Sequence, residues 1–278
     1  MRTGQFSGLG ATPTMTLASL FERLWEGYAA ITPQAGRILA LLEARGETVR
    51  NDHIALRTFD CSAVSIEVIA RPFVARGYAP GGDYEFPQKR VFARHFQHPD
   101  PTLPKVFISA LRVADFSPAL RATVESLVAA IPFGALARED FCASGRPWPI
   151  AFATYESLLA ESEYAAWVAA FGYVANHFTV DVGALESFAD LPALNAFITA
   201  SGFPLNESGG VIKGGPAVFL EQSSTRADRF EVAFDDGVRA VPSCYYEFAR
   251  RYPLASGELF QGFVATSADK IFESTDTR

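Results

Sequence analysis

Histidines on two similar strands are the side chains best suited to chemistry in this 278-residue chain. His53 lies in the segment NDHIALRTF and His177 in the segment NHFTV, and both segments have the apolar alternation typical of a strand. Histidine is the commonest metal ligand among side chains. A lone histidine is more often a packed side chain, but two at matching places could supply two ligands to one metal ion.

A third ligand would have to come from elsewhere in the chain, and Glu247 in the apolar segment CYYEFAR is the best candidate. A buried carboxylate is costly unless it is paired or bound to a metal. The alternatives are a salt bridge from Glu247 to Arg250 or Arg251, and Glu221 in VFLEQS as a rival ligand. Two histidines and one carboxylate are typical of non-haem Fe(II) oxygenases, and zinc can use the same set.

Arg57 and His95 are candidates for contact with a substrate. Arg57 shares a strand face with His53, ~13 Å away along the strand, and a guanidinium can clamp a carboxylate through two hydrogen bonds. A surface salt bridge is the competing interpretation. His95 could face the same cavity, whereas His98, three residues later on the other strand face, is expected in a turn.

Apolar periodicity and turn residues predict alternating helices and strands. Helices are expected over 16–45, interrupted at Thr32-Pro33, over most of 116–170 and over about 186–200, and a turn is expected at 78–82. The predicted strands are 53–59, 90–97, 105–111, 174–182, 216–223, 229–235 and 243–249.

Two parts of the chain repeat the same order of elements. In each part a strand with one histidine precedes a helix closed by glycine, and an aromatic residue, a proline and a Gly-Gly pair follow. Val91-Phe92-Ala93 and Val218-Phe219-Leu220 take matching places after this turn. If the repeats pack about a pseudo-twofold axis, equivalent positions on their first strands can meet near that axis.

The predicted fold class is therefore α+β, with paired β-α-β-β-β modules that form a curved mixed sheet around a metal site, and with added helices. Residues 1–15 are expected to be a flexible leader and residues 16–278 a single domain. Within it, module one spans about 50–112, a helical insert about 113–170, and module two about 171–250.

Composition narrows the classes of partner. The net charge of −7 and the pI of about 5.2 argue against nucleic acid. The sequence contains no uninterrupted apolar run of ~18 residues, so no membrane span is predicted, and no secretory signal is evident. The three cysteines form no CxxC pair, which fits a reducing, cytoplasmic location.

Several motifs in order resemble the 2-oxoadipate dioxygenase/decarboxylase family, over about residues 16–265. They are NDHIALRTF, RHFQHPDP followed by LPKVFIS, NHFTV, VFLEQSSTRA and CYYEFARR. The resemblance implies a fold related to the vicinal oxygen chelate superfamily, in which ligands commonly lie on the first strands and on the last strand of the second module. An aromatic-x-Glu-x-x-x-Arg ending, similar to that of the dioxygenases acting on 4-hydroxyphenylpyruvate, favours Glu247 over Glu221.

By this resemblance, His53, His177 and Glu247 would bind Fe(II), and Arg57 would position the substrate carboxylate. The implied reaction converts a 2-oxo acid, expected to be 2-oxoadipate, and O2 to 2-hydroxyglutarate and CO2, as in lysine catabolism. Candidates for binding the far carboxylate are Arg226, Lys213 and Arg250. Well-studied bacterial members of the family are longer, and this chain resembles the compact branch. The alternatives are a zinc or nickel isomerase or lyase of the same fold, and a non-catalytic binding module.

Overall fold

Eight strands form one mixed sheet in the computed structural model, which describes residues 15–265. Their spatial order is β2-β3-β4-β1-β5-β10-β7-β6. The bounds are β1 (Asn51–Phe59), β2 (Ala79–Phe86), β3 (Val91–Gln97), β4 (Lys105–Leu111), β5 (Ala175–Asp181), β6 (Lys213–Gly215), β7 (Leu220–Ser224) and β10 (Glu247–Arg251). A separate hairpin pairs β8 (Arg229–Phe234) with β9 (Gly237–Pro242). The helices are α1 (Leu17–Ile31), α2 (Pro33–Ala44), α3 (Ile66–Val74), α4 (Pro118–Ala129), α5 (Phe152–Glu161), α6 (Glu163–Phe171) and α7 (Leu191–Ala200).

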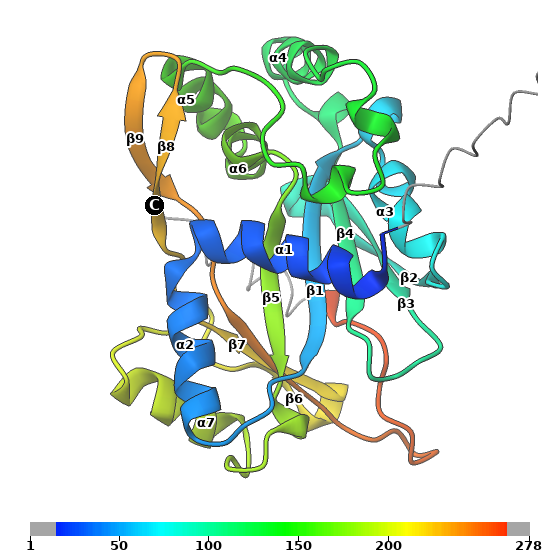
Figure 1. Cartoon of the computed structure of the whole chain (residues 1–278), viewed down its shortest axis with the longest axis vertical. Coiled ribbons are helices and arrows are strands. Elements are labelled where there is room, and N and C mark those ends of the chain that lie inside the picture. The colour runs from blue at the N-terminus through cyan, green and yellow to red at the C-terminus, as the bar shows by residue number, and fades with distance from the viewer. Residues whose placement is uncertain (1–14, 266–278) are drawn as a thin grey trace, which may run out of the picture.

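The sheet consists of two modules of the same topology, as the repeat predicts. Module one runs β1-α3-β2-β3-β4, and module two runs β5-α7-β6-β7-β10 with the hairpin inserted before its last strand. In each module the first strand pairs in parallel with the last, β1 with β4 and β5 with β10. The modules join through the antiparallel pair β1 and β5, at the centre of the sheet (Figure 1).

The register of β1 and β5 places the two first-strand histidines symmetrically. Ile54 pairs with Phe178, His53 pairs with Thr179, and Ala55 pairs with His177. Exchanging the two modules turns the pair His53–Thr179 into the pair His177–Ala55. The pseudo-twofold axis therefore passes between Ile54 and Phe178. Each histidine is one residue from that axis and points to the face opposite to Ile54 and Phe178.

One residue with a left-handed backbone conformation precedes the third strand of each module, β3 or β7, and these two residues align the repeats. Arg90 (φ 54°) and Phe219 (φ 62°) each follow a short 3-10 turn, and each precedes the first residue of β3 or β7. Val91 is therefore equivalent to Leu220, two residues beyond the Val218 of the sequence alignment.

The face of the sheet opposite to the histidines packs against α1. Trp25 and Tyr28 of α1 contact the ring of Phe178, with centroids 5.1 Å away in both cases. The Tyr28 hydroxyl also donates a 2.6 Å hydrogen bond to the carbonyl of Tyr245. In Figure 1, α1 lies across β5 and β1, so this helix fixes the two central strands from outside.

Some predicted bounds are wrong. The sequence predicts a turn at 78–82, but most of these residues form the start of strand β2. This strand lies at the edge of the sheet, where a proline is tolerated. Strand 216–223 begins only at 220 and strand 243–249 only at 247, while 229–235 belongs to the separate hairpin. Residues 130–151 contain short 3-10 turns in place of an α-helix. The expected leader lies almost wholly outside the described residues, and no helix within them is long and apolar enough to cross a membrane.

Candidate metal centre

Three side chains from different strands converge on the histidine-bearing face of the sheet. His53 Nε2 lies 3.5 Å from Glu247 Oε1, and His177 Nε2 lies 3.3 Å from Glu247 Oε2. One donor atom from each residue lies within 4.8 Å of the other two, and all three residues are buried. The structure thus brings together the two histidines and the glutamate that the sequence singled out.

A β-bulge beside each histidine supplies the group that orients its ring. Asp52 is the extra residue of β1 between the pairs Asn51–Val180 and His53–Thr179, and Asn176 is the extra residue of β5 at the second shift in register. A bulge redirects a side chain. Asp52 Oδ1 accepts from His53 Nδ1 at 2.7 Å, and Asn176 Oδ1 accepts from His177 Nδ1 at 3.1 Å. Both rings therefore present an unprotonated Nε2 toward Glu247.

Burial shifts the pKa values of all three clustered side chains toward their neutral forms. Burial lowers the pKa of both His53 and His177, so these imidazoles are neutral. Burial raises the pKa of Glu247 to about 8, although a 2.5 Å hydrogen bond from Gln222 Nε2 opposes that rise. Burial also acts to raise the pKa of Asp52, but Arg251 and His53 outweigh it and hold this pKa well below its usual range.

The donor set fits a divalent metal ion. Bonds of about 2.0–2.2 Å to a common ion hold neighbouring ligand atoms about 3 Å apart. The two distances from Glu247 to the imidazole nitrogens, 3.5 and 3.3 Å, are close to that value. A cation would also replace the proton that burial places on Glu247, because it stabilises the carboxylate directly. The hydrogen bonds that His53 and His177 donate to Asp52 and Asn176 are the kind that accompany metal-bound histidine.

Metal uptake at pH 7 is expected to release on the order of one proton, because the Glu247 pKa lies above that pH. The raised pKa means that the metal competes with a proton below pH 8, so affinity should rise about tenfold per pH unit up to that value and then level off. Calorimetric titration of the metal-free protein in two buffers with different ionisation enthalpies measures the release. Uptake without a released proton at pH 7 would contradict this expectation.

Arg57 lies on the same sheet face as the cluster, and it is buried. Its guanidinium lies over the rings of Tyr164 and Trp167, at 4.8 and 5.1 Å, and its Nη1 is 3.4 Å from Glu163 Oε1. Its charge contributes to lowering the pKa of His177, after the larger effects of burial and His53. Arg57 therefore lies over two aromatic rings near the cluster. It does form a salt bridge, with Glu163, but its own side chain is buried and not at the surface.

The other candidates divide between the two faces of the sheet. His95 is buried on β3, where its Nδ1 lies 2.9 Å from the Tyr84 hydroxyl, and it is not part of the three-donor cluster. Gly81 on the neighbouring strand leaves room for this ring, since a Cβ there would meet His95 Nε2 at 2.1 Å. The rival Glu221 accepts from the Tyr252 hydroxyl at 2.7 Å, away from the cluster.

The three cationic side chains considered for binding the far carboxylate differ in their burial. Arg226 has a largely exposed side chain, 63% accessible, and faces Glu207. Arg250 is partly exposed and donates to the carbonyl of Ala189. Lys213 is buried, and it pairs in register with the Gln222 that holds Glu247.

Sequence reasoning missed Asp52, Asn176 and Gln222 at this site, and it considered Arg251 only as a salt-bridge partner of Glu247. A signal existed for the first two, because a polar residue immediately precedes each repeated histidine. Gln222 carries no comparable signal. Arg251 is the last residue of the aromatic-x-Glu-x-x-x-Arg pattern, but only the strand pairing shows that its partner is Asp52 and not Glu247.

Comparison with known proteins assigns the chain to a family. The 2-oxoadipate dioxygenase/decarboxylase family matches residues 17–134 and 141–258. The chain belongs to this family. A 2-oxoadipate dioxygenase/decarboxylase of Arabidopsis thaliana, named as chloroplastic, is 36% identical over 250 residues, covering 81% of this chain and 67% of the relative.

Solved structures of similar proteins agree with membership of the family. The hydroxyglutarate synthase of Oryza sativa, crystallised in complex with 2-oxoadipate, is 30% identical, with a TM-score of 0.87 over 98% of both chains. A Shewanella frigidimarina protein, provisionally called a hydrolase, is 50% identical, with a TM-score of 0.86 over 90% of this chain and 98% of its own. A Ralstonia eutropha protein, provisionally placed in the glyoxalase superfamily, is 24% identical, with a TM-score of 0.73 over 89% of this chain and 85% of its own. This last likeness supports the predicted fold class alone.

Proposed function

We propose that this chain is an Fe(II)-dependent dioxygenase and decarboxylase that converts 2-oxoadipate and O2 to 2-hydroxyglutarate and CO2. One observation carries the proposal, namely that a buried cluster of two histidines and a glutamate is found in a chain that belongs to the 2-oxoadipate dioxygenase/decarboxylase family. His53, His177 and Glu247 are the proposed ligands. Bound Fe(II) would activate O2 and polarise the keto group, and the oxidised substrate would supply the electrons that reduce O2.

Arg57 is proposed to bind the carboxylate that leaves as CO2. A guanidinium donates two parallel hydrogen bonds to a carboxylate, which fixes the orientation of the acid and not only its position. The Tyr164 and Trp167 rings hold the Arg57 side chain in place before substrate arrives. The enclosed surroundings also exclude bulk water, which strengthens these contacts. His95 is a second proposed substrate contact, from the module-one side.

Lys213 is the group that we propose for the far carboxylate. Its ammonium donates to the carbonyls of Asn206, at 2.8 Å, and Val211, at 3.4 Å, and its charge acts to lower the pKa of Glu247. A buried ammonium beside the cluster can pair with the second carboxylate of a dicarboxylate substrate.

Lys213→Met is expected to lower kcat/KM for 2-oxoadipate by about 10- to 100-fold, the effect of losing a hydrogen bond between charged groups. The same variant should turn over 2-oxohexanoate, which lacks the far carboxylate, as well as the wild type does. Arg226→Gln is the matched control, because Arg226 is exposed, and it should leave both substrates unaffected. Equal losses on the two substrates would argue against this role for Lys213.

The function is tested by metal analysis of the purified protein and by an oxygen electrode with a series of 2-oxo acids. We expect one Fe(II) per chain, oxygen consumption equal to CO2 release with 2-oxoadipate, and 2-hydroxyglutarate as product. Oxygen-independent turnover would support the isomerase or lyase alternative. A protein that takes up no metal and whose stability is unchanged by a chelator would support the binding module.

Two further expectations accompany this function. Residues 16–278 are proposed to act as one domain with the module and insert bounds predicted above, although residues 266–278 lie outside the described part of the chain. The cytoplasm is the expected location, because Cys61, Cys142 and Cys244 are all free thiols. Fractionation of the source cells would test the location.

A further inference from the structure

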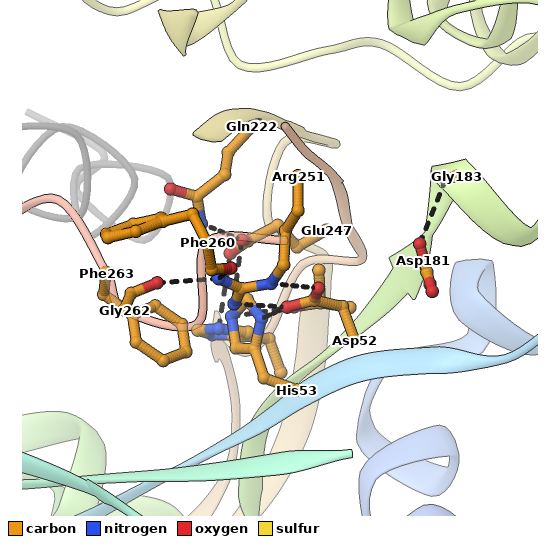
Figure 2. Close-up of polar contacts among 12 residues, drawn as sticks. Asp52, His53, Asp181, Gly183, Gln222, Glu247, Arg251, Phe260, Gly262 and Phe263 are labelled. Atoms are coloured by element: carbon orange, nitrogen blue, oxygen red, sulfur yellow. Dashed lines mark hydrogen bonds and ion pairs between the residues drawn. The ribbon is translucent and has the colours of Figure 1, made fainter. Parts of the chain in front are cut away.

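Arg251 connects the surroundings of His53 to the segment that follows the last strand of the sheet. Its Nε and Nη2 donate to the two oxygens of Asp52, at 2.6 and 2.9 Å. Its Nη1 donates to the carbonyls of Phe260, at 2.9 Å, and Gly262, at 2.7 Å. Figure 2 shows the guanidinium between Asp52 and these two carbonyls. One side chain thus satisfies a buried carboxylate and two backbone groups of a distant segment.

Asp52 carries this connection to the metal site. Its Oδ1 accepts from His53 Nδ1, so the position of the carboxylate sets the orientation of the ring and leaves Nε2 for the metal. Arg251 fixes both oxygens of that carboxylate through a two-pronged contact, which is directional as well as strong.

The segment 260–263 also contacts the site directly. The ring of Phe263 lies 4.8 Å from that of His53 and 5.3 Å from that of His95, and the Arg251 guanidinium lies over the same ring at 5.1 Å. The Phe263 amide donates to the Tyr84 hydroxyl at 3.1 Å. Phe263 is buried, so this segment forms the apolar wall on the module-one side of the cluster.

We propose that Arg251 is a positioning residue that couples the orientation of His53 to the docking of segment 260–263, so that the metal site and its apolar wall are completed together. The inference rests on the proposed metal site, and it concerns residues to which that proposal gives no role. Metal binding should therefore order the segment, and loss of Arg251 should weaken both the metal site and the wall.

The test compares Arg251→Gln with Arg250→Gln as a matched control. Arg250 is the preceding residue of the same strand, but it donates to Ala189 away from the cluster. Two quantities are measured for each protein. The first is the dissociation constant for Fe(II), by anaerobic competition with a chelator. The second is the rate of amide hydrogen exchange in peptides covering 252–265, with and without Fe(II).

In the wild type and in Arg250→Gln, we expect Fe(II) to slow exchange in this segment. In Arg251→Gln, we expect Fe(II) to bind about 10- to 100-fold more weakly and exchange to be fast with or without metal. Arg251→Lys keeps the positive charge near Asp52 but lacks the planar guanidinium with its several donors. It should therefore recover part of the Fe(II) affinity, but not the protection of the segment from hydrogen exchange. If Arg251→Gln does not fold, Arg251→Lys carries the test.

Two results would overturn the coupling while leaving the proposed function intact. One is an Fe(II) affinity in the Arg251 variants within twofold of the wild type. The other is weakened affinity with wild-type protection of the segment, which would limit Arg251 to holding Asp52. A wild-type chain that takes up no Fe(II) would overturn the proposed function and this inference together.

Discussion

Glu247→Gln is expected to lower affinity for Fe(II) by more than about 100-fold and oxygen-dependent turnover by about 1,000-fold or more. Glu247 is the only member of the described cluster that becomes anionic when a metal ion binds. Losing a ligand should therefore cost more than losing a hydrogen-bond partner of a ligand, which typically costs 10- to 100-fold. The amide oxygen of the new side chain can still accept from Gln222, so the fold should persist. Chelator competition and an oxygen electrode measure the two effects.

Glu221→Gln provides the control for this substitution. Glu221 lies on the adjacent strand β7, and its carboxylate accepts from Tyr252 outside the cluster. This variant should bind Fe(II) and consume oxygen like the wild type. If Glu247→Gln also retained wild-type metal affinity, the ligand assignment and the oxygenase proposal would both fail.

Arg57→Lys is expected to lower kcat/KM for 2-oxoadipate by about 100- to 1,000-fold while Fe(II) affinity stays near that of the wild type. A lysine keeps the charge but loses the two-pronged geometry and the stacking between Tyr164 and Trp167. Breaking a buried, hydrogen-bonded charge pair costs about 2–5 kcal/mol, which corresponds to this range. Steady-state kinetics and the chelator assay separate substrate binding from metal binding.

Arg94→Lys is a suitable comparison, because Arg94 lies on the strand β3 and forms a partly exposed ion pair with Asp83. It should have kinetics close to those of the wild type. Arg57→Lys with unchanged kcat/KM would remove Arg57 from the substrate site. Loss of Fe(II) from Arg57→Lys would instead indicate that Arg57 supports the cluster itself.

The sequence was sufficient to predict the repeat and the cluster, because both depend on local patterns. Alternation along β1 and β5 identified the strand faces, and two histidines at matching places indicated an axis between the modules. The strand at 78–82 was missed because Pro80, Gly81 and Gly82 have the composition of a turn. Their place at the sheet edge, against His95, follows from pairing between strands and not from local preference.

Residue type and period were enough to predict the paired topology and the two matching histidines, and the family resemblance added the choice of Glu247 and the interest in Arg57. The groups that hold the histidines and Glu247 in place became visible only in the folded chain. The two bulges turn Asp52 and Asn176 toward the histidines, and Arg251 joins Asp52 to a segment about 200 residues later in the chain. The physical reason is that such contacts depend on the register between strands and on the path of the chain after the sheet, which no local pattern encodes.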